Sequence, residues 1–218
     1  MRIGIFGGTF NPIHVAHLRS AEEVREAQSL DRVLFVPSAT PPHKQRHGLA
    51  SAAHRLAMVR LAIAGNPYFR VSTVEIERAG RSYSVDTIGV LRKQAPGNHF
   101  AFILGLDAFG EIGTWKKYRD LFSLCDIIVT SRPEYVLRRL RATLPVAARG
   151  EFWYGHETNI LEHSSGHRLV FQRISDLQIS ASAIRDRLKN QQSIRYLVPP
   201  SVLRYIDHHK LYRRGGTS

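Results

Sequence analysis

The sequence predicts an α/β fold: a doubly wound parallel sheet with helices on both faces, followed by a small helical C-terminal part. Short apolar runs of strand length alternate along the chain with stretches of helical periodicity, which is typical of the crossover units that build a parallel sheet. We find no internal repeat, low-complexity segment or linker. We therefore expect a single domain over 1–218, with 179–212 as its helical C-terminal part and 213–218 as a disordered tail.

Two glycines separate the first expected strand from the first expected helix. The strand covers 3–6, Gly7 and Gly8 end it, and helical periodicity begins near Val15. Glycine carries no side chain, so a phosphate can approach the main chain closely. The N–H groups and the dipole of a helix N-terminus also attract an anion. This segment therefore predicts a nucleotide-phosphate site.

The later elements follow from the same patterns. The run at 33–36 is apolar throughout, as expected for a strand covered on both faces. Ser51 can cap the second helix, and Pro199-Pro200 opens the last one. Residues 145–168 show no clear period, and we expect them to be irregular. The other expected strands are 69–77, 100–104, 127–129 and 169–171, and the other expected helices are 82–94, 134–144 and 179–190.

Two histidines lie at the start of the first helix. His14 and His17 are three residues apart, so they can face one point if a helical turn begins near them. There they would donate hydrogen bonds to phosphate oxygens. A zinc pair is an alternative, although no H-E-x-x-H segment or cysteine cluster supports it, and we expect no metal-ligand cluster. An ordinary surface turn with solvated histidines is a further alternative.

The composition limits the classes of function. The chain has 218 residues and a net charge of +13, from 31 Lys and Arg against 18 Asp and Glu. This charge attracts polyanions, and both nucleic acid and phosphorylated small molecules fit. No apolar run could span a bilayer and no secretion signal is recognised, so we expect a cytoplasmic protein without membrane contact. The single Cys125 agrees with a reducing compartment.

Two motifs carry a family resemblance. The segment 7–17, G-G-T-F-N-P-I-H-V-A-H, resembles G-G-T-F-[DN]-P-x-H-x-G-H, the signature of nucleotidyltransferases related to class I aminoacyl-tRNA synthetases. Ala16 stands where that family usually has glycine. The segment 179–185, I-S-A-S-A-I-R, resembles the second signature, I-S-x-[ST]-x-[IV]-R. The resemblance implies a Rossmann-like domain. Two hydroxyls and a guanidinium at a helix start also suit a triphosphate.

Four further segments narrow the resemblance. They are Pro41-Pro-His-Lys44, Ser82-Tyr-Ser-Val-Asp-Thr87, Gly105-Leu-Asp107 and Trp115. Together with the two signatures, from Arg2 to about Tyr212, they resemble the nicotinate-nucleotide adenylyltransferases. The resemblance implies transfer of the adenylyl group of ATP to nicotinate mononucleotide, giving nicotinate adenine dinucleotide and pyrophosphate in NAD biosynthesis.

The reaction that this resemblance implies needs alignment and charge stabilisation rather than a base. The attacking phosphate has a second pKa of about 6 and is already largely ionised near neutral pH. Mg²⁺ should bridge phosphate oxygens of ATP instead of occupying a protein cage. The expected catalytic residues, which donate to the phosphates or hold their charge, are His14, His17, Lys44 and Arg185.

The resemblance also assigns residues to each substrate. Trp115 offers a flat face to the pyridine ring, and Lys116, where an aromatic residue is common, should add positive charge that favours a carboxylate. Ser84 stands where threonine is common, and Asp107 could contact a ribose or a metal. The residues expected to bind ATP are Gly7, Gly8, Thr9, Phe10, His14, His17, Gly105, Asp107, Ser180, Ser182 and Arg185. Those expected to bind nicotinate mononucleotide are Tyr83, Ser84, Asp86, Trp115, Lys116 and Arg132.

Two other functions stay open at this point. One is another adenylyl- or cytidylyltransferase of the same superfamily, for example one that acts on phosphopantetheine. The other is a basic nucleic-acid-binding module without catalysis, although no basic run interleaved with aromatic residues marks an RNA-binding face. We expect ATP and nicotinate mononucleotide as partners and no nucleic acid. A homo-oligomer is left open.

Overall fold

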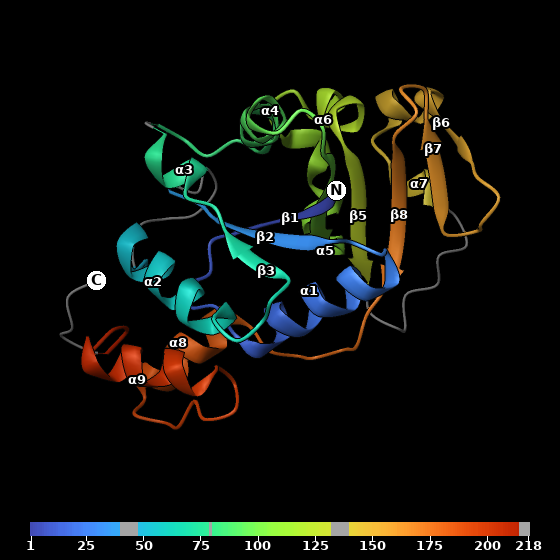
Figure 1. Cartoon of the computed structure of the whole chain (residues 1–218). Helices are drawn as coiled ribbons and strands as arrows, with labels where there is room; N and C mark the ends of the chain where they lie inside the picture. The colour runs from blue at the N-terminus through green and yellow to red at the C-terminus, as the bar shows by residue number, and fades with distance from the viewer. Residues whose placement is uncertain (40–47, 79, 132–139, 214–218) are drawn as a thin grey trace. The chain divides into compact units, whose positions relative to one another are not determined.

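The structure, a computed structural model, describes residues 1–39, 48–78, 80–131 and 140–213 (Figure 1). Its strands form a mostly parallel sheet with the order β3-β2-β1-β4-β5-β8-β7-β6, which confirms the predicted α/β, Rossmann-like fold. The strands are β1 (Arg2–Gly8), β2 (Arg32–Pro37), β3 (Phe69–Val71), β4 (His99–Gly105), β5 (Asp126–Ser131), β6 (Phe152–Tyr154), β7 (Ile160–His163) and β8 (Arg168–Arg173).

Helices connect these strands and follow the last one. The α-helices are α1 (Val15–Ala27), α2 (Ala52–Ile63), α3 (Val74–Glu77), α4 (Ser84–Gln94), α5 (Leu106–Gly110), α6 (Tyr118–Leu124), α7 (Leu140–Thr143), α8 (Ala181–Lys189) and α9 (Pro200–His208). Two 3₁₀ helices are η1 (Ile112–Thr114) and η2 (Val146–Glu151). Among the described residues, no helix is both long and apolar enough to cross a membrane.

The chain divides into two compact units, each assembled from separate stretches of sequence. Unit 1 comprises Met1–Gly7, Glu23–Val33 and Tyr83–Asp176, and unit 2 comprises Gly8–Glu22, Leu34–Ser82 and Leu177–Ser218. The boundary passes through β1, directly between Gly7 and Gly8. The expectation of a single domain over the whole chain stays a prediction.

Unit 1 is built on parallel pairings that continue into an antiparallel hairpin. β1 pairs with β4, β4 with β5 and β5 with β8, all parallel, whereas β8 with β7 and β7 with β6 are antiparallel. Figure 1 shows β5, β8, β7 and β6 side by side. The prediction of irregular structure over 145–168 is therefore wrong. Both strands of this hairpin are very short, and only one or two residues of each are buried, so their sequence pattern is weak.

Unit 2 contains α2, α3, α8 and α9, with α2 packed against α9. The strand predicted over 69–77 ends at Val71, and α3 follows it. The Ser72 hydroxyl accepts the N–H of Val74 at 3.3 Å, and Glu75 and Glu77 lie in the first turn of α3. A side-chain acceptor and acidic residues at a helix start outweigh the β-branched pattern here.

Two other predictions reach beyond the described residues. Of the helix expected over 134–144, the described part is α7, and residues 132–139 lie outside the description. The expected disordered tail begins at Arg213, which is described, whereas 214–218 lie outside the described residues. Both expectations stay predictions for those segments.

Gly4 in β1 has no room for a side chain. A Cβ at this position would lie 2.8 Å from Cδ1 of Ile103 and 2.8 Å from Cδ1 of Leu30. Ile103 is fully buried in β4 and Leu30 is 2% exposed. Because real Cβ atoms do not approach so closely, the terminal methyl groups of these two buried side chains would have to shift to make room for one more methyl group.

We therefore expect Gly4→Ala to lower the free energy of unfolding by about 1–3 kcal/mol through overpacking. Gly89→Ala in α4 is the matched control, because, apart from its own helix, no atom of the described residues lies within 4 Å of its added Cβ. It should be neutral or stabilising by about 0.5–1 kcal/mol. Urea denaturation of both variants makes the comparison, and equal effects would contradict the packing argument.

Candidate active site

The turn after β1 carries the first motif and lies in unit 2. Gly8 ends the strand, and a Cβ there would lie 2.9 Å from the ring of Phe10. Phe10 adopts φ 49°, in the left-handed region, and is 2% exposed. The ring therefore packs over the glycine, where any other residue would displace it.

His14 and His17 form a stacked pair at the end of this turn. Their ring centroids are 3.7 Å apart with an interplanar angle of 25°. The main-chain N–H of His14 donates to Nδ1 of His17 at 3.2 Å. An imidazole nitrogen that accepts a hydrogen bond carries no proton, so neutral His17 holds its proton on Nε2 and is a donor through that atom.

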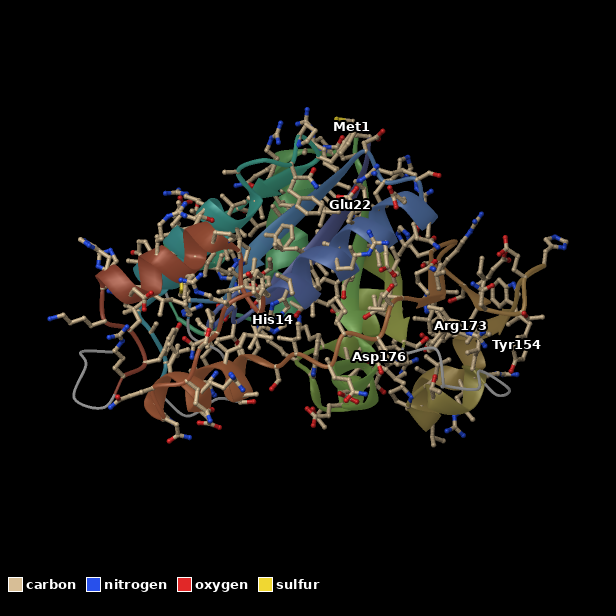
Figure 2. All side chains as sticks on the ribbon, turned by 90° about the horizontal axis from the view of Figure 1, so that it is seen from below. Met1, His14, Glu22, Tyr154, Arg173 and Asp176 are labelled. Atoms are coloured by element: carbon tan, nitrogen blue, oxygen red, sulfur yellow. The ribbon has the colours of Figure 1, made fainter. Side chains whose placement is uncertain are left out.

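Burial keeps His14 neutral as well. His14, labelled in Figure 2, is 5% exposed, and burial lowers the pKa of its imidazole to about 4. Its Nδ1 is buried without a hydrogen-bond partner among the described residues. A buried polar atom without a partner destabilises the folded protein unless a ligand or a water molecule forms a hydrogen bond with it. The two imidazoles lie together, as the sequence predicted, and that they face one phosphate stays a prediction.

The start of α1 offers fewer free N–H groups than the sequence suggests. The N–H of Val15 donates to the carbonyl of Leu197 at 3.0 Å, and the N–H of His17 donates to the carbonyl of His14 at 3.0 Å. With the His14 N–H also bonded, anion binding here depends more on side chains than on the helix N-terminus.

The second motif reaches the first through one arginine. Ser180 caps α8: its Oγ accepts the N–H of Ala183 at 3.2 Å and lies 3.1 Å from Oγ of Ser182. One turn further, Nη1 of Arg185 donates to the carbonyl of Asn11 at 2.8 Å. Two segments separated by about 170 residues in the chain are thus joined at the Gly8–His14 turn. Lys44 lies outside the described residues.

The residues predicted to recognise the pyridine nucleotide lie in unit 1. Nζ of Lys116 lies 2.9 Å from Oδ2 of Asp86 and 4.7 Å from the centroid of the Tyr83 ring. The extra positive charge expected from Lys116 is therefore largely balanced by Asp86. Trp115 is half-buried and meets the ring of Phe102 edge-on, with centroids 6.2 Å apart.

The remaining predicted residues lie at the end of a strand or near the start of a helix. Gly105 ends β4, and Asp107 is exposed in α5 directly after it. Gly7 belongs to unit 1, as do Gly105 and Asp107, while the other predicted ATP residues belong to unit 2. Ser84 opens α4. Arg132, which follows the last residue of β5, lies outside the described residues.

The sequence prediction missed three residues that hold the turn in place. They are Asn11, Tyr212 and Arg55. The Asn11 side chain accepts hydrogen bonds from the hydroxyl of Tyr212 at 2.7 Å and from the N–H of Ala50 at 3.0 Å. Arg55 was detectable in the sequence, because it shares the buried stripe of α2 with Val59, and a charged residue on an apolar stripe is a signal.

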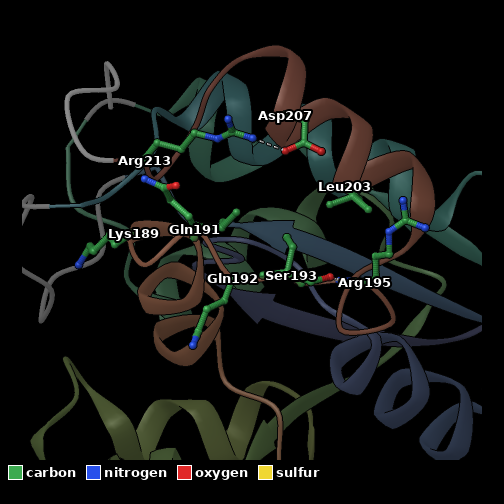
Figure 3. A pocket seen from close by; sticks show the side chains of 10 residues that line it. Lys189, Gln191, Gln192, Ser193, Arg195, Leu203, Asp207 and Arg213 are labelled. Carbon is green, nitrogen blue, oxygen red and sulfur yellow. Dashed lines mark hydrogen bonds and ion pairs between the residues drawn. The ribbon is translucent and has the colours of Figure 1, made fainter.

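A cavity of about 670 Å³ lies in another part of unit 2, around the α8–α9 connection (Figure 3). Arg213 and Asp207 form an ion pair of 2.7 Å on its wall. Of the predicted site residues that the structure describes, none lines it, so it is distinct from the described part of the predicted phosphate site. Within the described part of the chain, no group of three or more His, Cys, Asp or Glu side chains could hold a metal ion.

Comparison with known proteins shows the family of this chain. The cytidylyltransferase-like family model matches residues 5–187. A probable nicotinate-nucleotide adenylyltransferase of Geobacter sp. (strain M21) is 50% identical, covering 97% of this chain and 98% of the relative. That of Trichlorobacter lovleyi is 49% identical, covering 98% and 100%. The chain therefore belongs to the cytidylyltransferase-like family and, within it, to the nicotinate-nucleotide adenylyltransferases.

Solved structures show the same fold at lower sequence identity. The nicotinic acid mononucleotide adenylyltransferase of Plasmodium falciparum, complexed with NaAD, superposes with a TM-score of 0.71 at 19% identity, and 97% of each chain is covered. A putative nicotinate-nucleotide adenylyltransferase from Vibrio parahaemolyticus gives 0.65 at 15% identity, covering 97% of this chain and 94% of that chain.

The lowered pKa of His14 gives a pH prediction. An unfolded histidine, with pKa near 6.5, takes up a proton that the folded His14 excludes until pH is about 4. Stability should therefore fall as pH decreases from about 6.5 towards 4, by about 2 kcal/mol between pH 7 and pH 5 from this group. Urea denaturation at both pH values measures the loss. His14→Asn should remove this part of it, and an unchanged pH dependence in the variant would contradict the assignment.

Proposed function

We propose that this protein transfers the adenylyl group of ATP to nicotinate mononucleotide, forming nicotinate adenine dinucleotide and releasing pyrophosphate. The observation that carries the proposal is the stacked His14–His17 pair on a turn that Arg185 also binds. Neutral imidazoles and a guanidinium are donors for phosphate oxygens, and a phosphoryl-transfer site needs such donors. The relatives that share about half of the sequence carry the name of this activity.

The proposed chemistry is a direct displacement. A phosphate oxygen of nicotinate mononucleotide forms a bond to the α-phosphorus of ATP, and the bond from that phosphorus to the bridging oxygen breaks. Pyrophosphate leaves with the electron pair. We propose that Nε2–H of His17 and the imidazole of His14 donate to the phosphate oxygens, while Arg185 and Lys44 balance charge on the leaving group.

Metal and substrate recognition complete the proposal. We propose that Mg²⁺ binds through phosphate oxygens of ATP, which is its usual mode. The exposed carboxylate of Asp107 could supply one further oxygen ligand to this ion. Trp115 is proposed to stack on the pyridine ring, with Tyr83 beside it. The cytoplasmic location, the lack of a nucleic-acid partner and the oligomeric state stay predictions.

Activity is tested by pyrophosphate release with purified protein, Mg²⁺, ATP and nicotinate mononucleotide, together with detection of the dinucleotide. Replacing ATP by CTP, or the mononucleotide by phosphopantetheine, should abolish the release. No product from folded protein would reject the proposal, and product with phosphopantetheine would favour another member of the family.

For the histidine pair, we expect His17→Ala to lower kcat by about 10²–10³, the usual effect of losing one preorganised donor. His156→Ala is the control, because His156 is an exposed histidine of unit 1, and its kcat should match the wild type. A His17→Ala variant with near-normal kcat would remove His17 from the site.

Preference for the acid over the amide mononucleotide gives a second test of the pyridine residues. The Lys116–Asp86 pair has side-chain exposures of 43% and 39%. Lys116→Met removes the positive charge and leaves the negative charge of Asp86, which repels the substrate carboxylate. We therefore expect the ratio of kcat/KM for nicotinate over nicotinamide mononucleotide to fall by about two- to fivefold, a small effect because solvent screens an exposed ion pair. Adding Asp86→Asn should restore the ratio. An unchanged ratio in Lys116→Met would mean that the Lys116–Asp86 pair does not interact with the carboxylate of nicotinate mononucleotide.

A further inference from the structure

Arg55 in α2 is a buried cation whose hydrogen bonds to the described residues all go to main-chain carbonyls. It is 1% exposed. Its Nε donates to the carbonyl of Ala50 at 3.0 Å, Nη1 donates to those of Thr9 at 2.9 Å and Ser38 at 2.6 Å, and Nη2 donates to that of Ala39 at 3.0 Å. All five residues belong to unit 2. One side chain thus joins three stretches of chain that are separate in sequence.

Only a guanidinium can make this set of contacts. It presents five N–H donors in a rigid plane, whereas a lysine ammonium presents three on a flexible stem. Burial lowers the pKa of Arg55, and Glu75 and Tyr212 oppose that shift, so the group stays charged. A charge so deeply buried is retained where hydrogen bonds meet most of its donors, here four bonds from five N–H groups, since an unpaired buried donor is strongly unfavourable.

Hydrogen bonds connect Arg55 to the Gly8–His14 turn in two ways. The first is direct, because Thr9 lies between Gly8 and Phe10. The second passes through Ala50, whose carbonyl accepts from Arg55 and whose N–H donates to Oδ1 of Asn11 at 3.0 Å. The main-chain carbonyl of Asn11 in turn accepts from Arg185.

We infer that Arg55 is a positioning residue for adenylyl transfer: it fixes the main chain of Thr9–Asn11, and through it the placement of His14 and Arg185. It also fixes Ser38, Ala39 and Ala50, which flank residues 40–47 on both sides. Arg55 is buried beneath the turn and acts through these carbonyls. This role rests on the proposed function, because the effect of misplacing the turn is measured on the reaction.

The test replaces Arg55 by lysine and by glutamine, which keep part of the donor set. Misplacing donors by about 1 Å can reduce a rate by about 100-fold, so we expect kcat to fall by about 10- to 100-fold in both variants. Binding of nicotinate mononucleotide, titrated separately by calorimetry, should be little changed, because its predicted contacts lie in unit 1. Adding methylguanidinium to Arg55→Ala should restore part of kcat, since the small cation can supply the missing donors.

Met58→Ala is the matched control for stability. Met58 lies in the same helix, is fully buried, and has no part in the carbonyl contacts. It should lower Tm through a cavity while kcat stays near the wild-type value. All variants are measured at a temperature where circular dichroism shows them folded.

The outcomes separate the hypotheses. A kcat loss in the Arg55 variants beyond that of Met58→Ala supports positioning. An equal loss in both, or a failure of the lysine, glutamine and alanine variants all to fold, overturns it in favour of a purely structural role. An inactive wild-type protein would instead reject the proposed function. The contacts of Arg55 would then be tested by the Tm of Arg55→Ala, which should rise when methylguanidinium is added. No rise in Tm would then overturn the positioning role too.

Discussion

The need to satisfy main-chain carbonyls governs how the turn after β1 is held in unit 2. The turn after β1 has Phe10 in a left-handed conformation and therefore cannot continue a strand ladder. Its carbonyls are met instead by two guanidinium groups, Arg55 bonding to Thr9 and Arg185 bonding to Asn11. Arginine suits this task because its donors are rigid and numerous. The turn thus gains the fixed geometry that regular secondary structure provides elsewhere.

The charge state of the two histidines follows from the same compact turn. Rings stacked at 3.7 Å would repel each other strongly if both were protonated. Burial excludes the proton from His14, and the hydrogen bond to Nδ1 of His17 selects its tautomer. The two rings can therefore lie in contact without charge repulsion, and each keeps an N–H that can donate a hydrogen bond. Positive charge is left to arginine and lysine.

The fold could be predicted where the apolar pattern was long. β1, β2, β4, β5 and β8 lie where continuous apolar runs placed them, because buried parallel strands have few polar positions. The pattern failed for β6, β7 and α3, each of three or four residues. Such short segments are held by partners elsewhere in the chain or by a local cap, and neither leaves a readable period.

The sequence by itself determined the family, and its two motifs predicted most of the candidate site residues, since both depend on residue type and spacing along one segment. Only the tertiary structure decided which distant groups pair: Lys116 with Asp86, Arg185 with Asn11, and Arg55 with three separate stretches of main chain. The physical reason is that a hydrogen bond or an ion pair acts over a few ångströms. Folding, and not position in the chain, brings its partners within that range.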